Sequence, residues 1–373
     1  MHSDKIVYFF IGVFLLIGCN QPAYQTGRWS EERANLWLQE TGWLVGANFT
    51  PYNAINQIEM WQAETFDPER IDIELGWASD IGFNSMRVYL HDLVWEEDPE
   101  GFLERMDKYL EIADRHGIRT MFVIFDAVWN PVAFTGEQPE PIPHTHNSGW
   151  VQSPTAERLK DTANYSILEE YVKSVISYFA DDPRVVVWDL YNEPDNDNFG
   201  KFPDTELPDK RTYTYHLLVK SFEWARSVNP SQPLTAGVWW GNWEEEKLDE
   251  NPFNVFQLEN SDVISFHSYS DIYDFNYRLE LLKRFNRPLL CTEYMARTNN
   301  STFQEKLPVM KENRVAAYNW GLVAGKTQTN YPWSSWDSVY TSEPGIWFHD
   351  IFNASGELWS QDEIELFNRL LTD

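Results

Sequence analysis

Cysteine is nearly absent from this chain of 373 residues, in which Cys19 and Cys291 are the only two. A framework of several disulfide bonds is therefore excluded, and the fold must depend on a hydrophobic core of its own. Cys291 lies in the short apolar run 288–293, which indicates a buried thiol that packs as a small hydrophobe. No shift in composition divides the chain, so one large domain is favoured over two small ones.

Long hydrophobic runs are missing too, and the apolar block near the start of the chain spans only residues 6–17. This block, which follows Lys5, is too short to cross a membrane as a mature helix, but it suits a signal peptide. It continues into Leu16-Ile-Gly-Cys19, which resembles the cleavage box of bacterial lipoproteins, where the cysteine receives the lipid. An ordinary secretory signal peptide that is cut nearby is the alternative.

The lipoprotein interpretation divides the chain into three parts. Residues 1–18 are expected to be the signal peptide, residues 19–28 a tether behind the lipidated Cys19, and residues 29–373 the folded domain. The lipid would hold the protein at the bacterial cell envelope, facing the periplasm or the cell surface.

Positive charge is scarce, because 29 Lys and Arg residues stand against 58 Asp and Glu residues, giving a formal net charge of −29. Such an acidic surface is repelled by phosphate backbones and by anionic lipid. Nucleic acid is therefore excluded as a partner, and membrane contact is expected only through the lipid anchor. A glycine-rich phosphate loop after an early strand is also missing, which argues against a dinucleotide-binding sheet.

Strand-like and helix-like segments alternate along the chain. The expected strands are 42–48, 83–90, 118–125, 185–191, 233–239, 262–267, 288–293 and 314–320. The expected helices are 68–81, 102–116, 164–180, 211–228, 253–260, 273–285, 302–313 and 361–371. Eight such units over about 330 residues predict an α/β fold, a single (β/α)₈ TIM barrel with its active site at the C-terminal face of the strands. A doubly wound open sheet is the alternative.

Two of the expected strands end in a glutamate. The apolar, β-branched run 185–191 stops at Asn192-Glu193-Pro194, because proline cannot donate to a sheet ladder. The run 288–293 ends in Glu293. Since the carboxyl ends of the strands meet at one face of a barrel, Glu193 and Glu293 are expected to lie close together there. A pair of carboxylates in this arrangement suits the hydrolysis of a glycosidic bond with retention of configuration.

Further polar and aromatic side chains lie where strands are expected to end. They are Arg87, His91, Asp126, Asn192, His267, Tyr269 and Trp320. Arg87 on an apolar strand must be paired with a carboxylate, because an unpaired buried charge is costly. The loops after strands 3, 5 and 8 are rich in tryptophan, and flat rings in a cleft suit the apolar faces of sugars. Those residues are Trp129, Trp150, Trp239, Trp240, Trp243, Trp333 and Trp336.

With these motifs the chain after residue 40 resembles the clan A glycoside hydrolases, and most closely glycoside hydrolase family 5. The run 319–328 is similar to a bacterial subgroup whose members carry cellulase-like or 1,4-β-xylanase labels. The resemblance implies a (β/α)₈ barrel that hydrolyses a β-linked glycan or oligosaccharide with retention. It implies that Glu293 is the nucleophile and Glu193 the acid/base.

The resemblance also implies roles for the neighbouring residues. Arg87 would lie beside the nucleophile, Asn192 would hold the sugar 2-hydroxyl, and Trp320 would be the platform under the reacting sugar. His267 and Tyr269 resemble the His-x-Tyr pair that contacts sugar and nucleophile. The second histidine of the family has no clear counterpart, and His91 is the candidate for it.

Other interpretations remain beside the enzyme. Asp126 is either a ligand of a sugar hydroxyl or part of a network inside the barrel. A non-catalytic glycan-binding lipoprotein could use the same barrel, but it would not need the pair Glu193 and Glu293. His144 and His146 form only half of a zinc site, and the segment 195–206 imitates a calcium loop only in part. We therefore expect neither a metal nor another cofactor.

Overall fold

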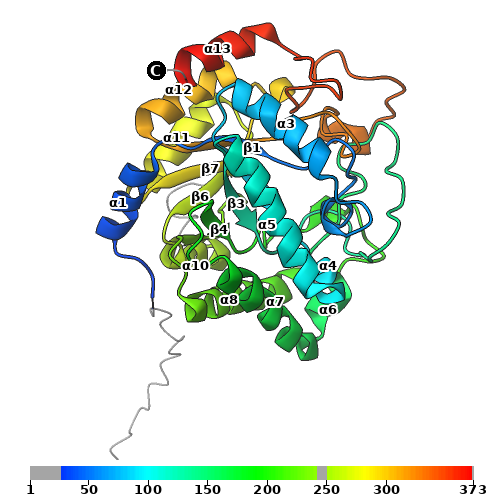
Figure 1. The fold of residues 1–373 in the computed structure, drawn as a ribbon, viewed down its shortest axis with the longest axis vertical. Helices are drawn as coiled ribbons and strands as arrows, with labels where there is room; N and C mark the ends of the chain where they lie inside the picture. The colour runs from blue at the N-terminus through cyan, green and yellow to red at the C-terminus, as the bar shows by residue number, and fades with distance from the viewer. Residues whose placement is uncertain (1–26, 242–249, 372–373) are drawn as a thin grey trace, which may run out of the picture.

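The computed structural model describes residues 27–241 and 250–371, and it shows a (β/α)₈ barrel (Figure 1). Eight parallel strands are ordered β5-β4-β3-β2-β1-β8-β7-β6. Their bounds are β1 Val45–Asn48, β2 Ser85–Tyr89, β3 Arg119–Val123, β4 Val185–Asp189, β5 Leu234–Thr235, β6 Ile264–Ser268, β7 Leu289–Tyr294 and β8 Ala316–Trp320. Every expected strand is found in its place, so the barrel is confirmed and the doubly wound sheet is wrong.

The barrel closes between β5 and β6 through a segment that continues beyond the short strand β5. Val238 forms an isolated parallel bridge with Phe266. The Val238 amide donates to the Ser265 carbonyl at 3.1 Å, and the His267 amide donates to the Val238 carbonyl at 3.1 Å. The strand expected over 233–239 is therefore interrupted but completes the circle.

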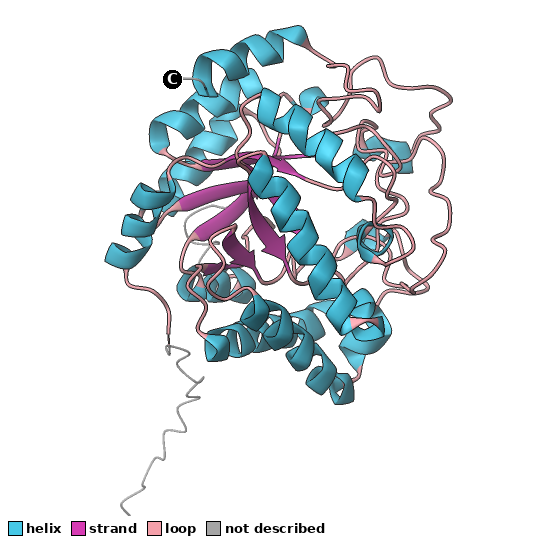
Figure 2. Cartoon of the chain, in the orientation of Figure 1, coloured by secondary structure: helices cyan, strands magenta, loops and turns pink. Residues whose placement is uncertain are grey.

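Helices surround the strands, as Figure 2 shows. The principal ones are α3 Pro68–Asp80, α5 Pro99–Arg115, α7 Tyr165–Tyr178, α8 Lys210–Val228, α10 Pro252–Asn260, α11 Ile272–Lys283, α12 Phe303–Asn313 and α13 Gln361–Leu371. All eight expected helices are present. Shorter helices that the sequence analysis did not predict are α2 Gln57–Trp61, α4 Asp92–Glu97 and α6 Ala156–Lys160.

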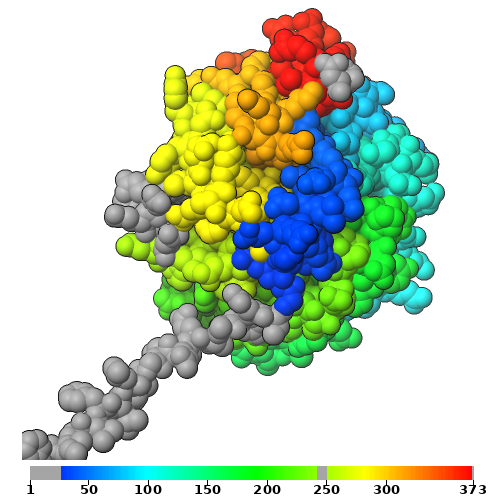
Figure 3. Space-filling view, turned by 90° about the vertical axis from the view of Figure 1, so that its left-hand side faces the viewer, coloured from blue at the N-terminus to red at the C-terminus, as the bar shows by residue number. Residues whose placement is uncertain are grey.

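An additional helix, α1 Glu31–Thr41, precedes β1 and lies in the blue region of the face that Figure 3 shows. Its contacts with residues just before β6 and β7 place it at the amino-terminal end of the barrel. Just before it, the Trp29 amide donates to Asp262 at 2.7 Å, and within it Asn35 donates to the Asn286 carbonyl at 2.9 Å. Trp37 packs against the cluster of strand residues that includes Leu290. The periodic pattern missed α1 because Ala34 is its only buried residue, so no apolar stripe marks it.

The hydrophobic core has two main parts. The larger one lies between the strands and the helices, and a smaller one contains Met121, Val187 and Tyr318 among other strand residues. Met121 is the register partner of both Arg87 and Val187, so the smaller cluster shares the inward face of Arg87. Among the described residues Cys291 is a buried free cysteine, as expected, and burial raises the pKa of its thiol to about 12.

The expected signal peptide 1–18 and lipidated Cys19 lie outside the described residues, as does most of the tether 19–28. Within the described part of the chain, none of the helices has the length and apolar character that crossing a membrane requires.

Candidate active site

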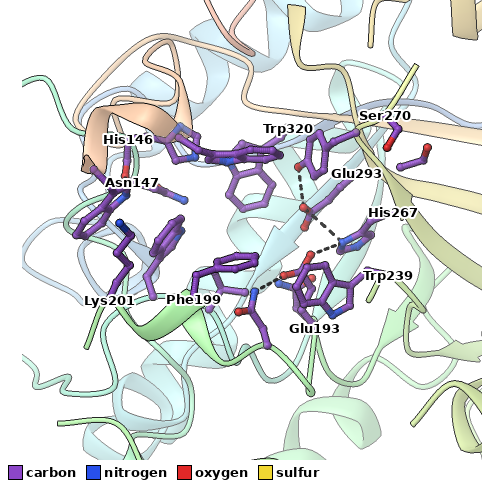
Figure 4. A pocket seen from close by; sticks show the side chains of 18 of the residues that line it. His146, Asn147, Glu193, Phe199, Lys201, Trp239, His267, Ser270, Glu293 and Trp320 are labelled. Atoms are coloured by element: carbon purple, nitrogen blue, oxygen red, sulfur yellow. Dashed lines mark hydrogen bonds and ion pairs between the residues drawn. The ribbon is translucent and has the colours of Figure 1, made fainter. Parts of the chain in front are cut away.

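A pocket of about 480 Å³ opens at the carboxyl ends of the strands (Figure 4). The connections that surround it are long: β3 ends at Val123 and α6 begins at Ala156, while β8 ends at Trp320 and α13 begins at Gln361. In a barrel these loops form the face where binding residues gather. The aromatic lining consists of Trp129, Phe199, Trp239, Tyr269, Trp320, Trp333 and Trp336.

Glu193 reaches the pocket from the turn after β4, where the extended chain ends. Its φ of 43° lies in the left-handed region, which non-glycine residues rarely adopt. Such a conformation costs on the order of 1–3 kcal/mol and persists only where the surroundings impose it. Asn196 donates to Glu193 Oε2 at 2.7 Å from the same turn. The carboxylate is thereby held in one orientation, with only 7 % of the residue exposed.

Glu293 lies near the end of β7 and accepts hydrogen bonds from three side chains. Arg87 Nη1 and the Tyr89 hydroxyl both donate to Oε1 at 2.9 Å. The Tyr269 hydroxyl donates to Oε2 at 2.7 Å. Donors on both oxygens stabilise the ionised carboxylate and fix its plane.

His267 joins the two glutamates, as the dashed lines in Figure 4 show. Its Nδ1 lies 2.7 Å from Glu193 Oε1 and 3.5 Å from Glu293 Oε2. One oxygen of each carboxylate and the imidazole nitrogen all lie within 4.8 Å of one another. Retaining glycosidases separate their carboxyl groups by about 5–5.5 Å and inverting ones by about 6.5–9.5 Å, so this spacing suits retention.

Arg87 is fully buried on β2 and connects Glu293 to the neighbouring strands. Its Nε and Nη2 donate to Asp189 Oδ2 at 3.0 and 2.7 Å, and Nη2 also donates to Asn192 Oδ1 at 2.7 Å. The buried arginine is therefore paired with two carboxylates, those of Asp189 and Glu293. Asp189 was not predicted as a site residue, although a lone charge inside the apolar run of β4 was a signal for it.

The two glutamates have opposite pKa shifts. Burial raises the pKa of Glu193, and the charge of Glu293 raises it further, against the contact with His267. Burial also acts to raise the pKa of Glu293. The charges of His267 and Arg87, together with the hydrogen bonds from Tyr269 and Tyr89, outweigh burial and hold this pKa below its ordinary value. Two carboxyl groups whose pKa values are shifted in opposite directions provide one protonated acid and one ionised base or nucleophile.

Most of the predicted site residues come together here. Asn192, His267, Tyr269 and Trp320 line the pocket with the two glutamates, and Arg87 lies directly behind Glu293. Trp320 ends β8 and makes edge contacts with Tyr89 and Trp150 at 5.6 and 5.8 Å between ring centroids. Its own indole is therefore held rigidly at the pocket wall.

His91 is not brought to the pocket. Its Nδ1 accepts from the Leu93 amide at the start of α4, and its Nε2 contacts the Gln152 carbonyl at 3.0 Å, so both nitrogens are used away from the cavity. The histidine that lines the pocket beside His267 is His146, from the long loop after β3. Its sequence signal was the motif His144-Thr-His146, which pointed to a metal rather than to a sugar.

Asp126 also lies behind the pocket rather than in it. Asn192 donates to its Oδ1 at 2.9 Å and the Trp150 indole donates to its Oδ2 at 2.7 Å. Of the two roles considered for Asp126, the structure shows the network inside the barrel.

The loop tryptophans are divided between the pocket and its supports. Those that line it are Trp129, Trp239, Trp333 and Trp336, while Trp150 lies behind Trp320 and Trp243 lies outside the described residues.

Within the described residues, Glu193, His267 and Glu293 are the one group whose ligand atoms are close enough to hold a metal ion. Hydrogen bonds among these three and with Arg87, Tyr89 and Tyr269 account for their proximity without an ion. Neither His144 nor the segment 195–206 is part of such a group.

A barrel in which strands β4 and β7 bring two glutamates to one pocket, with opposite pKa shifts, is the architecture of a retaining β-glycosidase. The family model described as cellulase (glycosyl hydrolase family 5) matches residues 77–340, well over half of the chain. The chain therefore belongs to glycoside hydrolase family 5, and it is a retaining β-glycoside hydrolase. Neither the fold nor the family supports the alternative of a non-catalytic glycan-binding protein.

Solved structures share the barrel. An exo-β-1,4-mannosidase from Opitutaceae bacterium strain TAV5 has 16% identity and a TM-score of 0.58, over 89% of this chain and 59% of that one. A GH5_18 variant from Streptomyces cattleya in complex with Manβ1-4GlcNAc has 14% identity and a TM-score of 0.59, over 88% and 80%. A family 5 mannosidase from Rhizomucor miehei has 13% identity and a TM-score of 0.51, over 87% and 93%. At these identities the likeness shows the fold. No curated protein sequence matches the chain.

Proposed function

We propose that Glu293 is the nucleophile and Glu193 the general acid and base of a double displacement on a β-linked glycan or oligosaccharide. The observation that carries this assignment is the asymmetry around the pair. Glu293 receives three donors, including the Arg87 guanidinium, whereas Glu193 receives none from a permanent cation. An ionised carboxylate is needed for attack and a protonated one for the leaving group.

In the first step a Glu293 oxygen attacks the anomeric carbon, and the bond from that carbon to the leaving oxygen breaks. Glu193 gives its proton to the departing oxygen, which becomes the hydroxyl of the released product. The sugar is then esterified to Glu293, so the negative charge of that residue is gone. Since this charge raised the pKa of Glu193, its loss favours an ionised Glu193.

In the second step Glu193 accepts a proton from water, and the oxygen of that water attacks the anomeric carbon. The ester bond to Glu293 breaks, which frees the carboxylate and returns Glu193 to its protonated form. Two inversions at the same carbon leave the β-configuration unchanged. Arg87 and Tyr269 receive the returning charge on Glu293, because they already donate to its two oxygens.

The other pocket residues are proposed to bind the reacting sugar. Asn192 is anchored by Arg87 and Asp126, which leaves it in one orientation beside the carboxylates. Trp320 presents a rigid ring to the pocket, suited to the apolar face of a sugar.

The test is hydrolysis of 4-nitrophenyl β-glycosides of glucose, mannose, xylose and galactose, each also offered as a β-1,4-linked disaccharide glycoside. We expect nitrophenol release from one of these series, with the β-anomer as the first product in proton NMR. Release of the α-anomer first would contradict the double displacement. No release from any member would contradict the proposed glycosidase chemistry.

We also propose that the mature protein is a lipoprotein anchored through Cys19, on the sequence pattern Leu16-Ile-Gly-Cys19. The hydrogen bonds of the first described residues indicate how this anchor would orient the protein. Arg28 Nε donates to the Ser261 carbonyl, and Trp29 bonds Asp262, both just before β6 at the end of the barrel opposite the pocket. An anchor rooted there would leave the active site facing away from the membrane.

Membrane fractionation of wild type and of Cys19→Ser tests the anchor. The wild-type protein should sediment with membranes and carry lipid on its mature N-terminus by mass spectrometry, whereas Cys19→Ser should be soluble or unprocessed. A mature wild-type protein without lipid would overturn the anchor and leave the catalytic assignment untouched.

A further inference from the structure

One side of the pocket is closed by a joint between the loops that follow β3 and β8. The Asn147 amide donates to the Thr327 carbonyl at 2.8 Å. Gln328 Oε1 accepts from the His144 amide at 2.5 Å, and Gln328 Nε2 donates to the Ile142 carbonyl at 2.9 Å. These bonds join segments that lie about 180 positions apart in the sequence, as the separations of 184 and 186 show. We call residues 142–147 and 327–337 together the closing wall.

His146 is the centre of the closing wall. Its amide donates to Ser335 Oγ at 2.9 Å, its Nδ1 bonds the Tyr331 carbonyl at 2.8 Å, and its carbonyl accepts from the Trp336 indole at 2.8 Å. Trp336 in turn stacks on Trp129 with 5.0 Å between ring centroids and 12° between the planes. The wall is therefore held by both backbone and side chains, and a sugar chain would have to break several bonds to pass it.

The loop after β4 adds a third connection to the wall. Lys201 forms an ion pair with Asp337 at the rim, and the ring of Phe202 contacts Trp336 at 5.9 Å between centroids. Three loops from β3, β4 and β8 thus meet on this side of the pocket. Figure 4 shows His146, Asn147 and Lys201 on the side opposite His267 and Trp239.

On the opposite side of the pocket, next to Glu193, the described residues include several aromatic ones. Trp239 is held by its indole, which donates to Asp195 at 2.8 Å, two residues after Glu193. Phe199 contacts both Trp239 and Trp240 and is 61 % exposed, so its ring borders solvent. The leaving group must lie beside the residue that protonates it, and the aromatic rings on this side suit the apolar face of a sugar.

The reacting sugar itself would lie against the closing wall. Trp320 and Asn147 border the same small cavity of about 20 Å³, so the sugar platform and the wall adjoin. Asn147 is buried and has a φ of 52°, and its Oδ1 has no hydrogen-bond partner among the described residues. Because a carbonyl only accepts, His146 must carry its proton on Nδ1 to bond Tyr331, which leaves Nε2 as an acceptor. Burial lowers the pKa of His146 to about 4, so the ring stays neutral.

We propose that the pocket holds a single sugar on the glycone side, so that the enzyme releases one monosaccharide at a time from the non-reducing end. Asn147 and His146 are the residues that bind the hydroxyls of this terminal sugar. The proposal rests on the proposed function, because the position of Glu193 as acid determines on which side of the bond the closing wall lies.

The 4-nitrophenyl glycosides separate the two proposals. An enzyme with one glycone position releases nitrophenol from the monosaccharide glycoside at once, and from the disaccharide glycoside only after a lag in which a free monosaccharide appears. Immediate release from the disaccharide glycoside, with a free disaccharide as the partner product, would overturn the single position and leave the glycosidase chemistry intact. A panel in which no glycoside reacts would contradict the glycosidase chemistry itself.

Oligosaccharides give the second arm of the test. Cellopentaose, mannopentaose or xylopentaose, chosen by the sugar that reacts above and labelled at its reducing end, should shorten by one residue at a time. A bulky substituent on the terminal non-reducing sugar should abolish this shortening. Early di- or trisaccharide products, or unchanged cleavage of the blocked chain, would overturn the proposal.

Asn147→Gly tests the wall residue without strain, because glycine accepts a positive φ. We expect KM for the reactive monosaccharide glycoside to rise about 5- to 10-fold, the effect of one lost hydrogen bond, with a smaller change in kcat. Asn35→Gly, at the other end of the barrel, is the matched control and should leave KM unchanged. An unchanged KM in Asn147→Gly, with the control also unchanged, would remove Asn147 from the sugar site.

Discussion

Glu193 and Glu293 are the same residue type at the carboxyl ends of two parallel strands, yet their surroundings differ. Glu293 lies within β7, near its end, where Arg87 and two tyrosine hydroxyls donate to it. Glu193 lies in a turn with a φ of 43°, where its partners are His267 and Asn196. The burial of both is similar, at 5 % and 7 % exposure, so burial alone does not distinguish them.

The difference shows how a barrel assigns two roles to one chemical group. Arg87 comes from β2, and it can reach Glu293 only because closure of the barrel brings β2 and β7 to the same interior. The cation lies on the side of Glu293, so that carboxylate stays ionised. Glu193 receives the repulsion of the resulting anion and tends to hold a proton.

Of the substitutions that test this difference, removal of Glu293 should reduce activity most. Glu293→Ala eliminates the only proposed nucleophile, so kcat should fall on the order of 10⁴- to 10⁶-fold on every substrate, including activated aryl glycosides. Steady-state kinetics measure this loss, and the exposed Glu111→Ala is the matched control. A Glu293→Ala enzyme that still hydrolyses an activated glycoside at the wild-type rate would reverse the assignment.

Removal of Glu193 should have an effect that depends on the leaving group. Glu193→Ala should lose about 10²- to 10⁴-fold on natural β-glycans, because general acid catalysis contributes that much. With a dinitrophenyl glycoside the first step should survive, and the glycosyl-enzyme should accumulate because no base activates the water.

Azide needs no base, so it should rescue Glu193→Ala and give the β-glycosyl azide, which NMR identifies. If azide instead rescues Glu293→Ala to the α-azide and leaves Glu193→Ala inactive, the two roles are exchanged.

The plot of kcat/KM against pH should have an acidic and a basic limb, one for each of the two glutamates. Activity requires Glu293 ionised and Glu193 protonated, so kcat/KM should fall as the pH drops through the lowered pKa of Glu293. It should fall again as the pH rises through the raised pKa of Glu193. Glu193→Gln, assayed with a dinitrophenyl glycoside, should lose the basic limb and keep the acidic one. Loss of the acidic limb instead would exchange the two assignments.

Removal of one tyrosine hydroxyl should have the smallest effect. Tyr269→Phe deletes a hydrogen bond to charged Glu293 that is worth about 1.5–3 kcal/mol, so kcat/KM should fall about 10- to 100-fold. The acidic limb should also move to higher pH, because that bond lowers the pKa of Glu293.

Tyr171→Phe is the control for this change, since the Tyr171 hydroxyl donates to the Ile124 carbonyl away from the pocket. If the acidic limb of Tyr269→Phe stays at the wild-type pH, the hydroxyl does not stabilise ionised Glu293 and has only a packing role.

Much of the site was predictable because its residues stand at regular places in the sequence. Glu193 follows the apolar strand β4 and Glu293 lies near the end of β7, and parallel strands in a closed barrel present their carboxyl ends at one face. Arg87 was predictable because it is a charged residue on an otherwise apolar strand. The alternation of periods two and 3.6 located all eight strands and the eight principal helices, because burial of one face imposes those periods.

The loop residues were not predictable in the same way. His91 directly follows one expected strand, and His146 lies in the long loop after the next. No local pattern in the sequence shows that His91 caps α4 while His146 lines the pocket. That difference depends on hydrogen bonds to residues far along the chain, Gln152 in one case and Tyr331 in the other.

The sequence by itself determined the barrel, the family resemblance and the two glutamates, since each follows from local periodicity or from a short motif. Only the tertiary structure decided that Asp189 shares Arg87, that Asp126 supports Asn192 from behind, and that the loops after β3 and β8 meet at His146. The physical reason is that loops have no repeating pattern of burial, so their positions are set by side-chain and backbone bonds between segments more than 60 residues apart.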